Sequence, residues 1–159
     1  CVTAPSTVLN YIKACEEAFL IYKAEREDLI GKRILSVDEK YYVVDTGMRN
    51  ANVASSPLRD VNQLLETVVF CEMKRRGYKV TIGRVKEKEV DFVCERDGDR
   101  VYLQVSYLMP TDETREREFS SLRLVPDQYE KVVLSMDKFD FSNGGIKHYY
   151  LPDYLLAAN

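Results

Sequence analysis

The amino-acid sequence lacks several features that would point to a common class of enzyme or membrane protein. Its 159 residues include one histidine, no tryptophan and no uninterrupted apolar run longer than five residues. A transmembrane helix needs about 20 apolar residues, so none is expected, and no secretory signal is visible. An imidazole-dependent nucleophile could use only His148, which lies in an alternating stretch and is interpreted as a structural or solvent-facing strand residue.

The four cysteines, at positions 1, 15, 71 and 94, form no C-x-x-C pair, which excludes a zinc ribbon and a thioredoxin-like redox motif. Cys15 and Cys71 fall on apolar helix faces, where thiols behave as small hydrophobic side chains, so we expect a reducing, cytoplasmic location. The sequence contains no glycine-rich phosphate loop. The chain begins with Cys1 and not Met, which suggests a piece of a longer protein.

The net charge of −3 argues against a uniformly basic nucleic-acid-binding surface. Residues 74–88 are nevertheless rich in cations, which are Lys74, Arg75, Arg76, Lys79, Arg84, Lys86 and Lys88. This segment is interpreted either as a surface that attracts a phosphate backbone or as a solvated helix end followed by a loop.

The N-terminal third of the sequence resembles half of a winged helix-turn-helix. Apolar residues at helical spacing run from Val8 to Phe19, and two strand-like stretches at 20–25 and 41–44 flank a turn at 31–33. Lys13 then lies on or near the exposed face of a recognition helix, and Lys32 and Arg33 lie on the wing. We therefore expect residues 1–50 to form a partial winged-helix segment.

Residues 51–159 follow an α/β pattern. A helix is predicted at 58–76, strands at 79–83, 89–95 and 100–108, a helix at 111–122, strands at 131–136 and 146–151, and a helix at 153–158. The nearly continuous apolar strand at 131–136 is typical of a mixed or parallel sheet that is covered on both faces.

Three polar residues interrupt apolar segments in this region. Glu66 interrupts the long helix, and Asp91 and Gln104 interrupt neighbouring strands. Carboxylates are rarely buried without a partner, because desolvating the charge costs several kcal/mol. Oxygen ligands on such elements can hold Mg²⁺ or Mn²⁺ beside a phosphate, so all three residues are candidate metal ligands.

A helix Glu, a strand Asp and an acid-x-Lys pair on the next strand resemble the PD-(D/E)xK nuclease fold. Glu66 and Asp91 match this pattern, whereas Gln104 stands in place of the acid and Ser106 in place of the lysine. The resemblance implies a restriction-endonuclease-like mixed sheet flanked by helices. It also implies a weakened site, because Gln supplies one neutral oxygen and Ser supplies no positive charge. Lys86 and Lys88 in the preceding loop are candidates to replace that charge, and Arg100 is also near in the sequence.

Most of the chain also resembles the C-terminal domain of unknown function 4143 that follows the AAA-type ATPase module in many bacterial and archaeal proteins. The matching stretches are 6–21, 40–47, 65–78, 89–93, 102–105 and 145–148. This resemblance implies that ATP is bound and hydrolysed by an N-terminal module outside the sequence. The partners it implies are that module, DNA or another protein, and no membrane.

The leading hypothesis is a nuclease-like, catalytically degenerate domain that serves as the DNA- or partner-engaging end of a AAA-type ATPase. One rival is an active metal-dependent endonuclease that uses Glu66 and Asp91. The other is a module that only binds proteins, which the acidic pI near 5.3 favours. Nucleic-acid contacts are predicted for nine cations, namely Lys13, Lys32, Arg33, Lys74, Arg75, Arg76, Lys79, Lys86 and Lys88.

Overall fold

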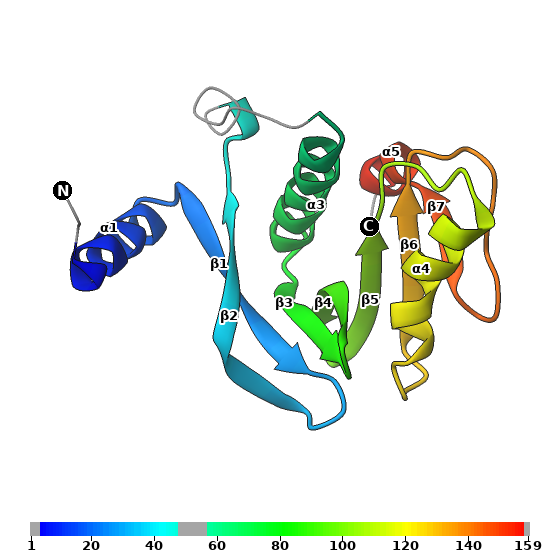
Figure 1. Ribbon diagram of the computed structural model, residues 1–159, viewed down its shortest axis with the longest axis horizontal. Coiled ribbons are helices and arrows are strands. Elements are labelled where there is room, and N and C mark those ends of the chain that lie inside the picture. Colours follow the sequence, from blue (N-terminus) through cyan, green and yellow to red (C-terminus); the bar gives the residue numbers. More distant parts are fainter. Residues whose placement is uncertain (1–3, 48–56, 158–159) are drawn as a thin grey trace.

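The computed structural model describes residues 4–47 and 57–157. One seven-stranded mixed sheet has the strand order β2-β1-β3-β4-β5-β6-β7 (Figure 1). The elements in chain order are α1 (Pro5–Glu17), β1 (Ile21–Asp28), β2 (Arg33–Val43), α3 (Pro57–Arg75), β3 (Lys79–Val85), β4 (Lys88–Arg96), β5 (Asp99–Val105), α4 (Asp112–Arg123), β6 (Glu130–Ser135), β7 (Lys147–Tyr150) and α5 (Leu151–Leu156). The predicted α/β mixed sheet flanked by helices is confirmed.

Two apolar cores lie on opposite faces of this sheet. On one face, Phe70 and Met73 of α3 pack with side chains such as Ile82 and Phe92. On the other face, Phe119 of α4 packs in a second cluster that is lined by Val93, Tyr102 and Val133. Side chains alternate between the faces of a strand, so each face receives its own set of apolar residues. The described helices include none that is both long and apolar enough to cross a membrane.

Local sequence signals account for several element ends. The turn between β4 and β5 places Asp97 at φ 55° and Gly98 at φ 88°. Two positive φ angles in a two-residue turn match the twist of a hairpin, as the sequence Arg-Asp-Gly-Asp predicts. Thr111 caps α4 by accepting a hydrogen bond from the Thr114 backbone N–H at 3.2 Å.

The β1–β2 hairpin belongs to the same sheet as the rest of the chain. Residues Arg26 to Asp28 of β1 pair in parallel with Ile82 to Arg84 of β3. Tyr42 of β2 stacks on Phe70 of α3 with ring centroids 4.4 Å apart. The hairpin that the sequence predicts as a wing is thus the sheet edge. The predicted division between residues 50 and 51 lies outside the described residues.

Helix α1 lies beyond this hairpin, away from the other helices (Figure 1). It has no buried residue, and Leu9 and Tyr11 are more than half exposed. On the apolar stripe that the sequence predicts for this helix, Val8 is exposed and Ile12 and Cys15 are half-buried, and the helix contacts β1.

A bulge in β4 lies at the candidate site. Thr81 pairs with Val93 and Gly83 pairs with Val90, so three steps along β4 face two steps along β3. Asp91 lies within the longer stretch. The β4–β5 pairs begin at Phe92 and Leu103, which leaves Asp91 just beyond the ladder. Bulges redirect side chains and are frequent next to functional sites.

Candidate functional site

Asp91 holds β4 and β5 together where their regular pairing stops. Its backbone N–H donates to Gln104 Oε1 at 3.4 Å, and its Oδ2 accepts from the Val105 N–H at 2.8 Å. Two bonds between side chain and backbone therefore continue the ladder by one step. Asp91 is buried, so the carboxylate depends on these contacts and on nearby charges.

Three carboxylates and a lysine meet on the α3 side of the sheet, and we call Lys40, Glu66, Glu89 and Asp91 the acidic cluster. Lys40 of β2 donates a short hydrogen bond to Glu89 and lies 3.9 Å from Glu66 Oε2. Arg26 Nη1 also donates to Glu89 Oε2 at 2.5 Å. Glu89 thus has two cationic partners, whereas Glu66 shares Lys40 with it.

The pKa values in the acidic cluster reflect this uneven pairing. Burial raises the pKa of Asp91 well above its ordinary value, and the charge of Glu66 adds to the effect. Burial also raises the pKa of Glu66, which Lys40 offsets only in part. Burial alone would raise the pKa of Glu89, but hydrogen bonds from Lys40 and Arg26 lower it. Burial opposes the charge on Lys40, yet Glu89 and Glu66 raise the pKa of this lysine.

A cavity of about 300 Å³ opens beside this cluster and is lined by Lys40, Tyr42 and Glu66 among others. The Tyr42 hydroxyl is buried and has no hydrogen-bond partner within residues 4–47 and 57–157. Burial raises the pKa of Tyr42, and the charge of Glu66 raises it further, so the two groups are close. The hydroxyl in turn contributes to lowering the pKa of Glu66, so the cavity wall holds it beside this carboxylate.

Gln104 joins Asp91 to α4 and does not lie free as a ligand. Its Oε1 accepts from Ser121 Oγ at 3.2 Å as well as from the Asp91 N–H, and its Nε2 donates to Glu118 Oε2 at 3.3 Å. Ser106 is buried at the end of the same strand. The charge of Glu118, which is also buried, contributes to raising the pKa of Glu66.

The predicted triad is therefore only partly assembled. The structure brings Asp91 into contact with Gln104 and into electrostatic range of Glu66. Within the described parts of the chain, no group of three or more His, Cys, Asp or Glu side chains is arranged to hold a metal ion. Lys88 donates to Ser120 Oγ at 2.6 Å and Lys86 is exposed.

Lys40, Glu89 and Glu118 also lie at the site and were not predicted from the sequence. Glu89 is two residues before Asp91 in the sequence, and this proximity is the signal that could have identified it. Lys40 has no such signal, because only the pairing of β1 with β3 brings β2 over α3.

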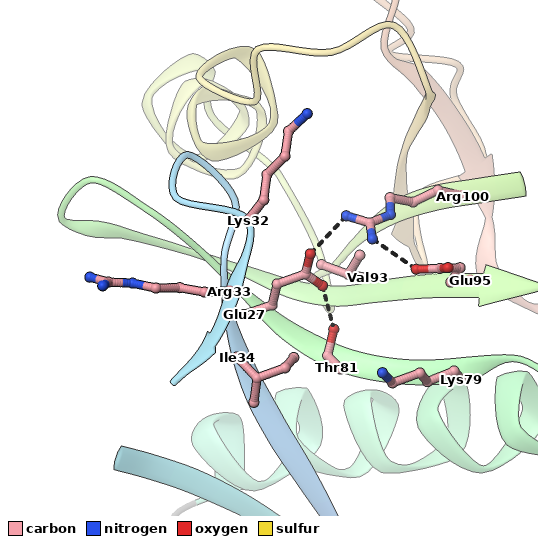
Figure 2. A pocket seen from close by; sticks show the side chains of 9 residues that line it. All are labelled: Glu27, Lys32, Arg33, Ile34, Lys79, Thr81, Val93, Glu95 and Arg100. Carbon is pink, nitrogen blue, oxygen red and sulfur yellow. Dashed lines mark hydrogen bonds and ion pairs between the residues drawn. The ribbon is translucent and has the colours of Figure 1, made fainter. Parts of the chain in front are cut away.

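The predicted nucleic-acid-binding cations separate into different environments. Lys32, Arg33 and Lys79 line one hollow of about 140 Å³ (Figure 2). Lys13 lies 3.8 Å from Glu17 at the surface of α1. The prediction for Arg76 needs correction, since its side chain is only 6% exposed and Nη2 donates to the backbone oxygens of α5, including that of Tyr154 at 2.9 Å. Arg76 therefore holds the C-terminal helix in place.

The floor of this hollow is an ion-paired network. Figure 2 shows Glu27 turned toward Arg100 and Thr81. Arg100 Nη1 donates to Glu27 Oε1 at 2.8 Å, and Thr81 Oγ1 donates to Glu27 Oε2 at 3.2 Å. Arg100 Nη2 also donates to Glu95 at 2.8 Å. Both oxygens of the buried Glu27 carboxylate thus have donors.

The single histidine lies in a buried polar group that differs from a catalytic triad. Ser135 Oγ lies 2.9 Å from His148 Nε2 and donates to Asp137 Oδ2 at 2.9 Å. The Phe141 backbone N–H donates to His148 Nδ1 at 3.3 Å, so both ring nitrogens have neighbouring polar groups. Ser135 is fully buried. The structural interpretation of His148 as a strand residue is confirmed.

Comparison with known proteins gives relatives without a described activity. The chain is 34% identical over 155 residues to an uncharacterized protein of Haemophilus influenzae. The aligned region covers 97% of this chain and 38% of that protein. It is 30% identical over 130 residues to an uncharacterized protein of Methanocaldococcus jannaschii, covering 79% of this chain and 26% of that protein. The chain thus spans well under half the length of these relatives. No protein-family model and no solved structure matches it.

Proposed function

We propose that this chain is a nuclease-like domain that engages DNA but has lost catalytic competence. The observation that carries the proposal is the state of two site positions, Gln104 on β5 and Ser106 directly after it. Gln104 is bonded to Asp91 and α4, and Ser106 carries no charge. The order of Glu66 on a helix and Asp91 on a strand, with the degenerate pair on the adjacent strand, is the order of the PD-(D/E)xK pattern.

The residues present fit a divalent cation poorly. Lys40 already supplies a positive charge to Glu66 and Glu89. The Gln104 oxygen accepts two hydrogen bonds, so its use as a metal ligand would break them. Mg²⁺ binding needs oxygen ligands that are free to surround the ion. We therefore assign Glu66 and Asp91 to a vestigial site and derive no catalytic step from it.

Helix α1 supports a second proposal, that the domain also binds a protein. Its apolar side chains Val8, Leu9 and Tyr11 are exposed, and none of its residues is buried. A helix of this length is marginal in water unless its apolar face is covered. The longer relatives are compatible with an adjoining module in the same protein. We propose that this module is an N-terminal AAA-type ATPase, which would bind ATP in the cytoplasm.

A plasmid-nicking assay with Mn²⁺ or Mg²⁺ tests the proposed loss of catalysis. The wild-type chain is expected to leave supercoiled DNA intact. The double variant Gln104→Glu with Ser106→Lys restores an anionic ligand and a cation on one strand face, and it is expected to nick the plasmid.

Circular dichroism of the double variant serves as the folding control, because a buried lysine is costly unless Asp91 or Glu66 pairs with it. Nicking by the wild type that disappears in Asp91→Ala would instead establish the active endonuclease. A folded double variant that neither binds Mn²⁺ nor cuts would contradict the vestigial-nuclease account.

A further inference from the structure

The hollow in Figure 2 lies on the face of the sheet opposite α3. Lys79 and Thr81 alternate along β3 with Val80 and Ile82, and the latter two belong to the core that contains Phe70 of α3. Helix α4 packs over β4, β5 and β6 on this face. The hollow is lined by residues of β1, the β1–β2 turn, the start of β2, and β3, β4 and β5, so it occupies the part of the face beside α4.

Cationic side chains outnumber acidic ones around this hollow. Four of the lining side chains are cations and two are acids, which are Lys32, Arg33, Lys79, Arg100, Glu27 and Glu95. Arg100 bonds to both acids, and Thr81 satisfies the other oxygen of Glu27. The two acids are therefore neutralised in part from within the floor, and the three remaining cations give the rim its charge.

These rim cations are exposed and extend into solvent. Lys32 and Arg33 project from the β1–β2 turn away from the Glu27 carboxylate, and Lys79 lies on the other side of Glu27 (Figure 2). Arg33 is 73% exposed and its contact with Asp28 is long, at 3.7 Å. Such a weak surface pair costs little to exchange for a phosphate.

Cations of the 74–88 segment are used differently. Arg75 makes two hydrogen bonds of 2.7 Å to Glu72. Arg76 is held by α5, and Lys88 bonds to Ser120. The dense cationic stretch in the sequence therefore supplies less free charge in the fold than its composition indicates. Lys79 lines this hollow together with Lys32 and Arg33, which come from a distant part of the chain.

We propose that the hollow beside α4 binds the phosphate backbone of DNA through Lys32, Arg33 and Lys79. This inference rests on the proposed DNA engagement and replaces the 74–88 segment as the main contact surface. Phosphate contacts by flexible cations do not read bases, so binding is independent of sequence and falls steeply with salt. Glu27 at the floor opposes the incoming phosphates and limits the affinity.

Two matched triple variants test the assignment by fluorescence anisotropy with a short labelled DNA duplex. The rim variant combines Lys32→Asn, Arg33→Ala and Lys79→Ala. The control variant combines Lys86→Asn, Arg75→Ala and Lys74→Ala, which removes the same charge from exposed positions. Lys32 and Lys86 both have positive φ, at 50° and 54°, and Asn tolerates this conformation.

Loss of three phosphate contacts is expected to reduce the magnitude of the slope of log K against log salt by about 2–3 in the rim variant, and by less than about 1 in the control.

A third variant, Glu27→Gln, keeps hydrogen-bonding groups for Arg100 and Thr81 but removes the negative charge. It is expected to bind DNA more tightly than the wild type, which a purely structural Glu27 would not produce.

The outcomes separate the inference from the proposed function. Wild-type binding that the rim variant retains in full, or that the control variant weakens more, overturns the assignment of this hollow while DNA engagement stands. A wild type that fails to bind the duplex even at low salt overturns DNA engagement and the inference together. Weakening confined to the rim variant, with tighter binding by Glu27→Gln, supports the assignment.

Discussion

The acidic cluster and the Glu27 network lie on opposite faces of one sheet, and their buried carboxylates differ in how many hydrogen-bond donors and cations they have as partners. Glu27 has a donor for each oxygen, from Arg100 and Thr81. In the acidic cluster, Glu66 and Asp91 depend on one lysine that is bonded more closely to Glu89. Burial raises the pKa of both of these carboxyl groups.

This difference means that Glu27 stabilises the fold, whereas ionised Glu66 and Asp91 do not. A buried acid with matched donors contributes to stability, and removing its charge leaves the partner unpaired. A buried acid with too few cations costs stability in its ionised form. Sites that retain such groups are frequently functional or derived from functional ones, since activity and stability compete.

The largest expected effect comes from removing the cation of the acidic cluster. Lys40→Met leaves Glu66 and Asp91 without their shared positive charge and is expected to lower the free energy of unfolding by about 2–3 kcal/mol near neutral pH. Urea unfolding measures the change. This loss should become smaller as the pH is lowered. Because their pKa values are raised, Glu66 and Asp91 become protonated in the folded protein at a higher pH than in the unfolded chain.

Lys147→Met is the matched control, since Lys147 pairs with Glu130 where both side chains are about half exposed. Its effect should be much smaller than that of Lys40→Met, because an exposed ion pair is screened by water and salt. Equal losses in the two variants would remove the distinction between the acidic cluster and an ordinary surface ion pair.

Removing one carboxylate charge on each face of the sheet should change the free energy of unfolding in opposite directions. Asp91→Asn keeps an acceptor for the Val105 N–H and is expected to raise the free energy of unfolding by about 1 kcal/mol at pH 7. Glu27→Gln weakens the bond to Arg100 and is expected to lower it by about 1–2 kcal/mol. Thermal unfolding of both variants would show the contrast, and two changes of the same sign would contradict it.

The pH dependence of the Asp91→Asn effect follows from the direction of the shift. The folded protein raises the pKa of Asp91, so ionisation costs stability as pH rises from the unfolded value, near 3.9, to the folded one. The advantage of Asn should therefore vanish at acidic pH below the unfolded pKa and be complete above the folded pKa. A gain that is constant over pH would point to packing instead of charge.

Tyr42→Phe is expected to have the smallest effect. The Tyr42 hydroxyl is buried, makes no hydrogen bond of ordinary geometry in the described chain and interacts with the nearby Glu66 carboxylate, so its removal should change stability by no more than about 1 kcal/mol. The stacking of the ring on Phe70 is retained. A loss of more than about 1 kcal/mol in chemical denaturation would show that the hydroxyl makes a bond that matters to the fold.

The sequence predicts the local parts of this fold better than the long-range ones. Helix α3, the Asp97–Gly98 turn and the Thr111 cap follow from periodicity and turn chemistry, and Asp91 and Gln104 were identified because polar residues interrupt apolar strands. Lys40 could not be placed, because its position depends on strand pairing between distant segments.

The misplacement of Arg76 has the same origin. In the sequence it looks like an exposed cation at a helix end, but α5, which lies 75 or more residues further on, packs against it and takes its hydrogen bonds. Side-chain partners from remote elements decide whether a charge is available to a ligand. Composition and spacing within one segment do not contain that information.

Isothermal titration of Mn²⁺ into the wild type and into Gln104→Glu tests the central claim, that the site is nuclease-like but degenerate. Because Lys40 pairs with Glu66 and Glu89 and the Gln104 oxygen is bonded, the wild type should bind with a Kd of about 1 mM or weaker. The added carboxylate should tighten binding, and further change to Asp91→Asn should abolish the gain. Micromolar binding by the wild type that is lost in Asp91→Asn would contradict the account and establish a working metal site.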